Sequence, residues 1–312
     1  MRLAFPRSLR PGWLAVHAQQ AALTLVHATR GPDGIVVDLC RELDGGERAP
    51  EALPALRKSL GLEKFRCTTL LPVGNYQLIQ TETPDVPREE WREALRWRLK
   101  DLLDYPAEEA VFDVADIPTE QYAPGRQRQC LVVAARRSQV LDHVQPLLSA
   151  RLQLDAVDVA EMAQRNVAAL FEEENRGLAF LAFDDSGGLL TVSFKGELYV
   201  SRHIDVYPAQ MAGADDERRQ QMFERVALEA QRTLDTFDRQ YSFMTITRLK
   251  VALWPELAGM LESLRSSLYI PVDEVDLAEH MDLTACPELA QKATQARLIY
   301  AIGAALRDGD AA

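Results

Sequence analysis

Apolar and polar positions along the 312-residue chain alternate between strand-like and helix-like spacing. Short apolar runs bounded by turn residues are typical of strands, and apolar positions three and four residues apart are typical of helices. The opening block has β-rich runs over 13–26 and 34–40, separated by turn residues at 31–34, then a helix over 51–60 and a strand over 67–71. It therefore predicts the order strand, strand, helix, strand.

A second, smaller block of strands and helices occupies the middle of the chain. Strands are expected over 76–82, 110–116 and 129–135, and a helix over 138–152. Another helix begins after Pro87, because proline suits a first helical turn. These elements predict a small α+β unit.

Beyond residue 150 the pattern returns to strands flanked by longer helices. The expected elements are a helix over 157–171, strands over 177–183, 189–194 and 197–204, the longest helix over 217–241, a strand over 248–253, a helix over 256–268, a short strand near Val272 and a last helix over 287–307. Strands with helices thus occur twice. This order predicts two lobes, with the smaller unit inserted into the first.

Composition narrows the class of protein. The chain has 35 Lys and Arg against 47 Asp and Glu, a net charge of −12, which argues against a nucleic-acid partner. Its four cysteines lie far apart, without the spacing that holds zinc, and are expected to be reduced thiols. No apolar stretch approaches the roughly 20 residues of a membrane helix, and no signal-peptide core is present, so we expect a cytoplasmic protein.

Residues 1–12 contain Arg2, Arg7 and Arg10 and no acid, which is typical of a flexible basic leader. Contact of this leader with anionic lipid is the alternative interpretation.

Three segments carry a resemblance to a known family. Residues 76–118 resemble the corresponding stretch of the MshI family, the PilM-like proteins of mannose-sensitive haemagglutinin (MSHA) pilus biogenesis. The sequence AIGAALR at 301–307 resembles the closing motif of PilM, and Glu229-x-x-Arg232-Thr233-Leu234 resembles a PilM helix motif. The resemblance extends over 13–307. It implies an α/β fold of the actin-like ATPase (ribonuclease H-like) class, in the variant shared by PilM and FtsA.

The same resemblance implies a division of the chain into a leader, two lobes and an inserted subdomain. The expected ranges are 1–12 for the leader, 13–75 with 151–176 and the C-terminal helix 287–308 for the first lobe, 76–150 for the inserted subdomain, and 177–286 for the second lobe.

In function, the resemblance implies an adaptor at the inner-membrane platform of a type IV pilus. Its partner would be a PilN-like membrane protein, gripped by its N-terminal cytoplasmic tail, with the pilus extension ATPase as a further candidate partner. The chain would then reach the membrane only through its partner. Tyr76 and Trp97 are the candidate partner-binding residues; core packing of Trp97 is the alternative.

Actin-like ATPases hold phosphate and Mg²⁺ with two glycine-rich hairpins that each carry an Asp, because amides must approach phosphate closely and Mg²⁺ prefers carboxylates. In the first hairpin, His17, Gln19 and Thr24 stand at the positions of the Asp, Gly and Lys. In the second, Ala182 stands at the Asp position and Asp184 at a Gly position. A slip of one or two residues would instead bring Asp184 to the metal position.

The adenosine turn Leu-x-Gly-Gly is replaced by the sequence VALW at 251–254, and Glu229 and Arg232 are retained. We therefore expect a pseudo-ATPase with no catalytic residues, no metal and no cofactor. The first alternative is an ATP- and Mg-binding switch, in which Glu229 and Arg232 contact the nucleotide rather than only each other as an i, i+3 ion pair. A second is a cytoplasmic domain like that of GspL in type II secretion.

Overall fold

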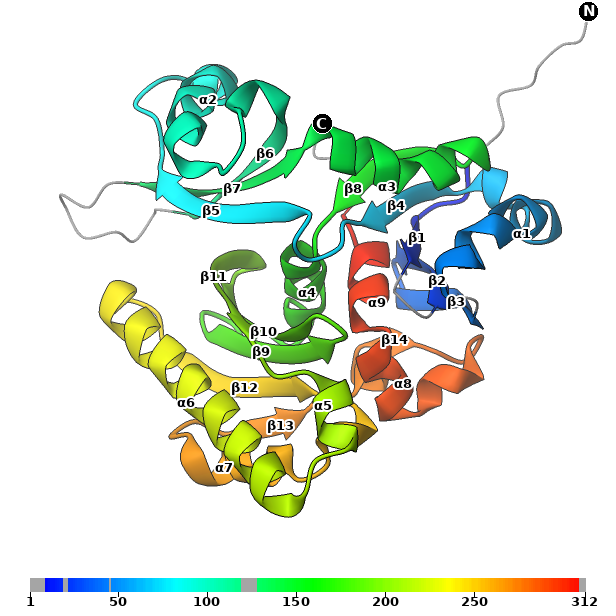
Figure 1. The fold of residues 1–312 in the computed structure, drawn as a ribbon. Coiled ribbons are helices and arrows are strands. Elements are labelled where there is room, and N and C mark those ends of the chain that lie inside the picture. Colours follow the sequence, from blue (N-terminus) through cyan, green and yellow to red (C-terminus); the bar gives the residue numbers. More distant parts are fainter. Residues whose placement is uncertain (1–8, 19–21, 45, 119–127, 309–312) are drawn as a thin grey trace, which may run out of the picture. The chain divides into compact units, whose positions relative to one another are not determined.

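The computed structural model describes residues 9–18, 22–44, 46–118 and 128–308 (Figure 1). Residues 1–8 of the expected leader and Gln19 therefore lie outside the described residues. The described chain forms two compact units. One comprises the residues up to Leu70 and from Pro146 onward, here called the main unit, and the other comprises Leu71–Gln145, here called the inserted unit.

The main unit contains two sheets that repeat one topology. In each, three antiparallel strands are followed by two parallel ones. The first sheet has the order β14-β3-β2-β1-β4-β8, with β14 (Met281–Asp282) added at its edge, and the second has the order β11-β10-β9-β12-β13. The strands are β1 (Trp13–Ala18), β2 (Ala22–Gly31), β3 (Gly34–Asp44), β4 (Arg66–Leu70), β8 (Leu154–Asp158), β9 (Gly177–Asp184), β10 (Gly187–Phe194), β11 (Glu197–Ile204), β12 (Ile246–Ala252) and β13 (Val272–Glu274).

The helices pack on these sheets through their apolar faces. In α6, the buried positions recur at helical spacing, from Phe223 through Val226, Ala230 and Leu234 to Phe237. Asp215 caps this helix by accepting a hydrogen bond from the Arg218 N–H at 2.8 Å. The helices of the main unit are α1 (Leu53–Leu60), α4 (Ala160–Ala168), α5 (Pro208–Ala212), α6 (Asp216–Gln240), α7 (Met260–Ser267), α8 (Lys292–Arg297) and α9 (Ile299–Ala305). No described helix combines the length and apolarity needed to cross a membrane.

Two central helices, α4 and α9, join the two sheets (Figure 1). Helix α9 packs on β1 and β2 of the first sheet, α4 packs on β9 and β10 of the second, and the two helices pack on each other. At their contact, a Cβ atom on Gly303 would lie 2.1 Å from the carbonyl oxygen of Ala163. Asn166 donates a hydrogen bond to the Gly303 carbonyl at 2.9 Å. The backbones are therefore so close that a side chain at 303 would displace the facing carbonyl.

The inserted unit is a three-stranded antiparallel sheet, β5 (Tyr76–Glu82), β7 (Gln129–Arg136) and β6 (Ala110–Asp116), in the order β5-β7-β6. Helix α2 (Trp91–Leu102) buries Leu95 and Leu99 against Cys130 and Val132 of the central strand. Helix α3 (Arg137–Ser149) follows β7 and crosses the boundary between the two units at Pro146. The unit thus has a small apolar core of its own.

All four cysteines are free and buried. Burial raises the pKa of Cys40 and of Cys67 to about 12 and that of Cys286 to about 11, and it also raises the pKa of Cys130. Each thiol therefore stays protonated at neutral pH.

The structure corrects several expected elements. The run over 13–26 is two strands, β1 and β2, which pair as a hairpin. The helix expected over 157–171 begins only at Ala160, because 154–158 form the parallel strand β8 beside β4. The helix expected over 287–307 is broken: α8 ends at Arg297 and α9 begins at Ile299, around Leu298.

Smaller differences have local causes. The helix expected over 256–268 begins at Met260, because Gly259 has a φ of +94° and interrupts it. Helix α5 and strand β14 are too short, at 5 and 2 residues, to produce a periodic pattern.

The close approach of α4 and α9 predicts that Gly303→Ala destabilises the protein by about 3 kcal/mol, since a methyl group must displace a backbone carbonyl. Urea unfolding measures the change. Gly213→Ala is the control: an added Cβ there meets no atom within 4 Å, so a change below about 0.5 kcal/mol is expected. Equal stability of the two variants would contradict the proposed contact.

Candidate functional site

The first hairpin places two of the substituted phosphate positions opposite each other. His17 on β1 pairs directly with Thr24 on β2. Thr24 is fully buried, and His17 is half-buried. Neither an imidazole nor a hydroxyl supplies the metal-binding carboxylate or the lysine charge expected at these positions.

In the second hairpin, the Asp184 carboxylate binds its own turn. Ala182 is fully buried in β9, opposite Leu189 of β10. Asp184, at the end of β9, accepts a hydrogen bond from the Ser186 N–H at 2.7 Å. Burial is the main cause that raises the pKa of Asp184 to about 6; the Ser186 bond opposes the rise, and the neighbouring Asp185 contributes to it. The Ser186 N–H, which could otherwise donate to a phosphate, therefore donates to the Asp184 carboxylate.

A buried carboxylate and a histidine meet beside this turn. Glu161, in the first turn of α4, is buried, and its Oε1 lies 3.1 Å from Nε2 of His203 on β11. This hydrogen bond is the main cause that raises the pKa of His203 above its ordinary value. Burial raises the pKa of Tyr300 on α9, and the charges of Asp184 and Glu161 add to the shift. Four elements therefore bring two carboxylates, a histidine and a tyrosine close together.

These acids have hydrogen-bond partners within the protein. Within the described ranges, no group of three or more His, Cys, Asp or Glu side chains is placed to hold a metal ion. Glu161 is instead hydrogen-bonded to His203, and Asp184 to its own turn. The charge at this place favours cations over the phosphates of a nucleotide.

The position of the adenosine turn holds an indole. Trp254 follows β12 and packs, partly buried, against the main core of the unit. Its buried Nε1 has no hydrogen-bond partner among the described residues. Trp254 thus places a bulky side chain where the family pattern has a glycine.

Glu229 and Arg232 form the expected i, i+3 ion pair on α6, with 3.3 Å between Glu229 Oε1 and Arg232 Nη1. A second cation binds the same carboxylate: Arg202 Nη2 lies 2.9 Å from Glu229 Oε2. Arg202 is the main cause, with Arg232, that lowers the pKa of Glu229. The carboxylate therefore has two partners within the protein.

The inserted unit carries a separate pocket of about 110 Å³. Tyr76, at the start of β5, lines it together with Tyr105 and Arg136. The Arg136 guanidinium lies 4.7 Å from the Tyr105 ring centre, and the buried Tyr105 hydroxyl has no hydrogen-bond partner in the part of the chain that is described. The pocket thus offers an aromatic wall, a cation and an unsatisfied hydroxyl.

Trp97 is exposed on α2, as expected for one of the two tryptophans of this helix. Its side chain is 68% exposed, and the Lys100 Nζ lies 4.2 Å from the ring centre. Trp91 is half-buried and donates from its indole N–H to the Val86 carbonyl at 3.1 Å. An exposed indole of this size is the kind of side chain that anchors a protein partner.

Sequence reasoning did not identify the Glu161–His203 pair or the residues Tyr105 and Arg136. Glu161 and His203 are 42 residues apart, and no local pattern connects them. Tyr105 precedes Pro106 in the corner between α2 and β6, which was a usable signal for a fixed turn.

Comparison with known proteins gives the fold. No family model and no curated protein matches the chain. A solved structure of the PilM-PilN type IV pilus biogenesis complex matches it with a TM-score of 0.74 and 21% identity, over 96% of this chain and 98% of that one.

Two further solved structures are similar at lower scores. The cytoplasmic domain of EpsL, an inner membrane component of the type II secretion system of Vibrio cholerae, matches with a TM-score of 0.45 and 14% identity, over 91% of this chain and 95% of that one. A Bacteroides thetaiotaomicron protein with an actin-like ATPase fold and unknown function matches with a TM-score of 0.49 and 10% identity, over 93% of this chain and 100% of that one. The repeated sheet topology and the match to PilM show that this chain has the actin-like ATPase fold.

The raised pKa of Asp184 predicts a pH-dependent effect of Asp184→Asn. The folded pKa of about 6 lies above the ordinary 3.8, so ionisation of this group weakens the folded state as the pH rises from about 4 to 6. The variant keeps an oxygen for Ser186 but removes the charge. We expect it to be more stable than the wild type by about 2 kcal/mol at pH 7.5, with the difference vanishing below pH 4.

Urea unfolding at both pH values measures this difference. Asp185→Asn, at the exposed neighbouring position, is the control and should show a much smaller gain. A gain that is independent of pH would show that Asp184 is not the titrating group.

Proposed function

We propose that this protein is a non-enzymatic adaptor in the inner-membrane assembly platform of a type IV pilus, and that it binds the N-terminal cytoplasmic tail of a PilN-like membrane protein. The observation that carries the proposal is the similarity to a chain of the PilM-PilN complex over 96% of the sequence. The resemblance of 76–118 to the MshI family supports the finer assignment to an MSHA-like pilus. In this role the protein stays cytoplasmic and is held at the inner membrane by its partner.

The inserted unit supplies the contact in this proposal. Its exposed Trp97 and the pocket lined by Tyr76 are two anchoring features on one small unit. A tail residue that hydrogen-bonds to the Tyr105 hydroxyl would satisfy a buried polar group, which is worth more than an equivalent bond at the surface. Aromatic anchors of this kind commonly dominate the binding energy of an interface.

The nucleotide site is degenerate in the same proposal. The buried Ala182 and Thr24 offer no ligand to Mg²⁺, Asp184 occupies a turn amide, and Trp254 replaces a glycine. In this proposal, an actin-like fold with these substitutions binds a partner and does not hydrolyse ATP. We therefore assign no step of ATP chemistry to these residues.

Titration of a fluorescent peptide from the tail of the membrane protein encoded beside this one tests the adaptor role. We expect binding that Trp97→Ala or Tyr76→Ala weakens at least about tenfold, because each removes an aromatic anchor. Tyr269→Ala is the matched control, since Tyr269 is also an exposed aromatic residue but lies in the main unit. Failure of every neighbouring pilus-protein tail to bind would refute the proposal.

The thermal unfolding midpoint in millimolar Mg·ATP tests the competing ATPase switch. We expect no shift, since a ligand must bind the folded state to raise the midpoint. A shift that disappears in Glu229→Ala, but persists in Glu224→Ala on the same helix, would instead support nucleotide binding at the retained Glu229.

A further inference from the structure

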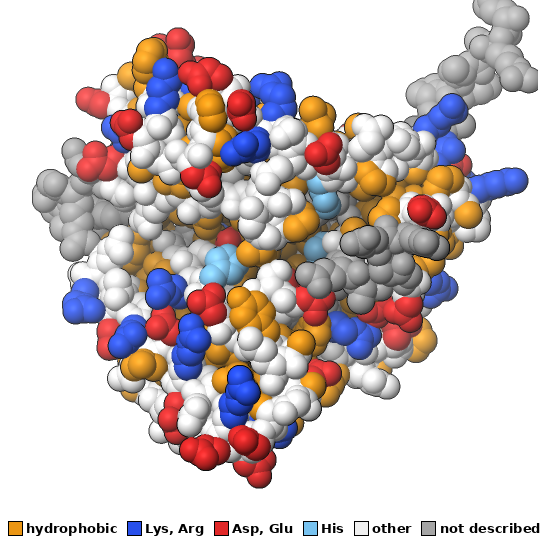
Figure 2. All heavy atoms as spheres, in the orientation of Figure 1, with side chains coloured by type: hydrophobic (Ala, Val, Ile, Leu, Met, Phe, Trp, Pro, Cys, Tyr) orange, Lys and Arg blue, Asp and Glu red, His pale blue; other side chains and the backbone are white. Residues whose placement is uncertain are grey.

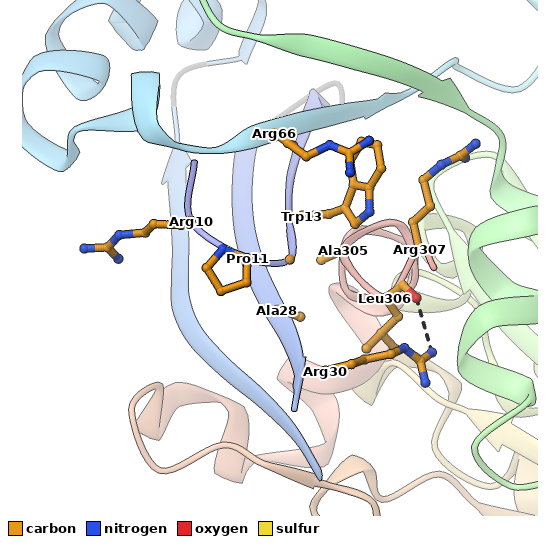
Figure 3. Close-up of a pocket in the computed structure, with 10 residues that line it drawn as sticks. Arg10, Pro11, Trp13, Ala28, Arg30, Arg66, Ala305, Leu306 and Arg307 are labelled. Atoms are coloured by element: carbon orange, nitrogen blue, oxygen red, sulfur yellow. Dashed lines mark hydrogen bonds between the residues drawn. The ribbon is translucent and has the colours of Figure 1, made fainter. Parts of the chain in front are cut away.

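A pocket lined by arginines lies in the main unit, apart from the residues considered so far (Figure 3). It has a volume of about 220 Å³ and is lined by residues 10–13, the end of β2, the start of β4 and the end of α9. Four of its ten lining residues are arginines, Arg10, Arg30, Arg66 and Arg307, and none is acidic. On the face in Figure 2, acidic and basic side chains are interspersed, and the whole chain is acidic. A lining with four basic side chains and no acidic one is therefore unusual for this acidic protein.

One wall is built around a buried indole. The guanidinium of Arg66 lies 4.3 Å from the ring centre of Trp13, and that of Arg307 lies 5.6 Å from it. Arg66 pairs with Asp155 at 3.4 Å, and Arg307 pairs with the buried Asp158 at 3.0 Å. Neither aspartate lines the pocket. These carboxylates therefore orient the two arginines without filling the space beside them.

The opposite wall, residues 10–12, is held in place by backbone contacts. The Arg10 N–H donates to the Lys64 carbonyl at 2.7 Å, and Nε2 of the buried His27 lies 3.0 Å from the Pro11 carbonyl oxygen. Gly12 has a φ of +88°, and a Cβ there would lie 2.1 Å from the Ala28 carbonyl oxygen. This segment is thus fixed against the first sheet.

The remaining two arginines have weak counter-charges. Arg30 donates to the Leu306 carbonyl at 3.2 Å, and its carboxylate partner Asp308, at 3.4 Å, is 85% exposed, so the pair is strongly screened. The Arg10 guanidinium lies 5.0 Å from the ring centre of Phe65, and no described carboxylate forms an ion pair with it. The pocket therefore retains positive charge that the protein itself does not neutralise.

We propose that this pocket binds the phosphate group of an organic phosphate. Arginines from four separate segments line it, and a tetrahedral phosphate can accept hydrogen bonds from several directions, whereas a planar carboxylate engages fewer. The apolar wall formed by Pro11, Ala28 and Leu306 would contact the carbon skeleton attached to the phosphate. Both a soluble phosphate ester and the headgroup of phosphatidic acid carry this chemistry.

Two probes at 0.15 M salt distinguish these sources. Calorimetry measures the binding of glycerol 3-phosphate, and co-sedimentation measures binding to phosphatidylcholine vesicles with and without phosphatidic acid. Binding of the soluble ester supports a soluble ligand, and binding to the phosphatidic acid vesicles alone supports the lipid headgroup. We expect the double variant Arg10→Gln, Arg30→Gln to weaken the binding at least about tenfold. Because Arg10 and Arg30 are exposed and have weak counter-charges, the folded state should persist, which the thermal midpoint checks.

The matched control is Arg218→Gln, Arg225→Gln, which removes the same charge from exposed positions on α6. Unchanged binding in this control is expected. Equal weakening in both double variants would show a general charge effect and overturn the proposal, as would failure of the wild type to bind either probe.

Discussion

The contact between α4 and α9 is the constraint on which the main unit depends. The two helices are the link between its sheets, and their backbones meet where Gly303 faces the carbonyl oxygen of Ala163. Small residues permit this approach. A buried side-chain amide then fixes the position of α4 on the second sheet, because Gln164 donates to the carbonyls of Phe180 and Leu189. A buried amide tolerates only one register, because any shift would leave it unpaired. The relation of the two sheets is therefore fixed by geometry as well as by apolar burial.

Charged groups at and beside the positions aligned with the family's nucleotide site have partners within this chain. Asp184 is bonded to its own turn, Glu161 to His203, and Glu229 to Arg202. Here the same groups are satisfied without a ligand. The proposed adaptor role is consistent with this arrangement, since a scaffold needs stability without a ligand.

Local patterns in the sequence predicted much of the fold. The strands over 76–82 and 110–116 match in both bounds, because alternation of apolar residues and flanking turns marks them clearly. The strand β8 was missed because its five residues run directly into α4 and share its apolar character. The break at Leu298 has no glycine or proline to signal it. These failures occur where tertiary packing, rather than local preference, decides the conformation.

The candidate sites were less accessible to sequence reasoning. The exposure of Trp97 and the ion pair of Glu229 with Arg232 follow from helical spacing, and both were expected. The arginine pocket joins residues 10, 30, 66 and 307, which only the folded chain brings together. The same holds for Arg202, which binds Glu229 from a strand 27 residues away. A pattern along the chain contains no information on such pairs.

The burial of all four thiols has a practical consequence. Alkylating reagents react with thiolates, and a thiol whose pKa is raised by burial presents very few of them at neutral pH. A cysteine introduced at an exposed position of either unit should therefore react alone, with the native cysteines left in place. Fluorophores or spin labels can then report on each unit in the otherwise unaltered protein.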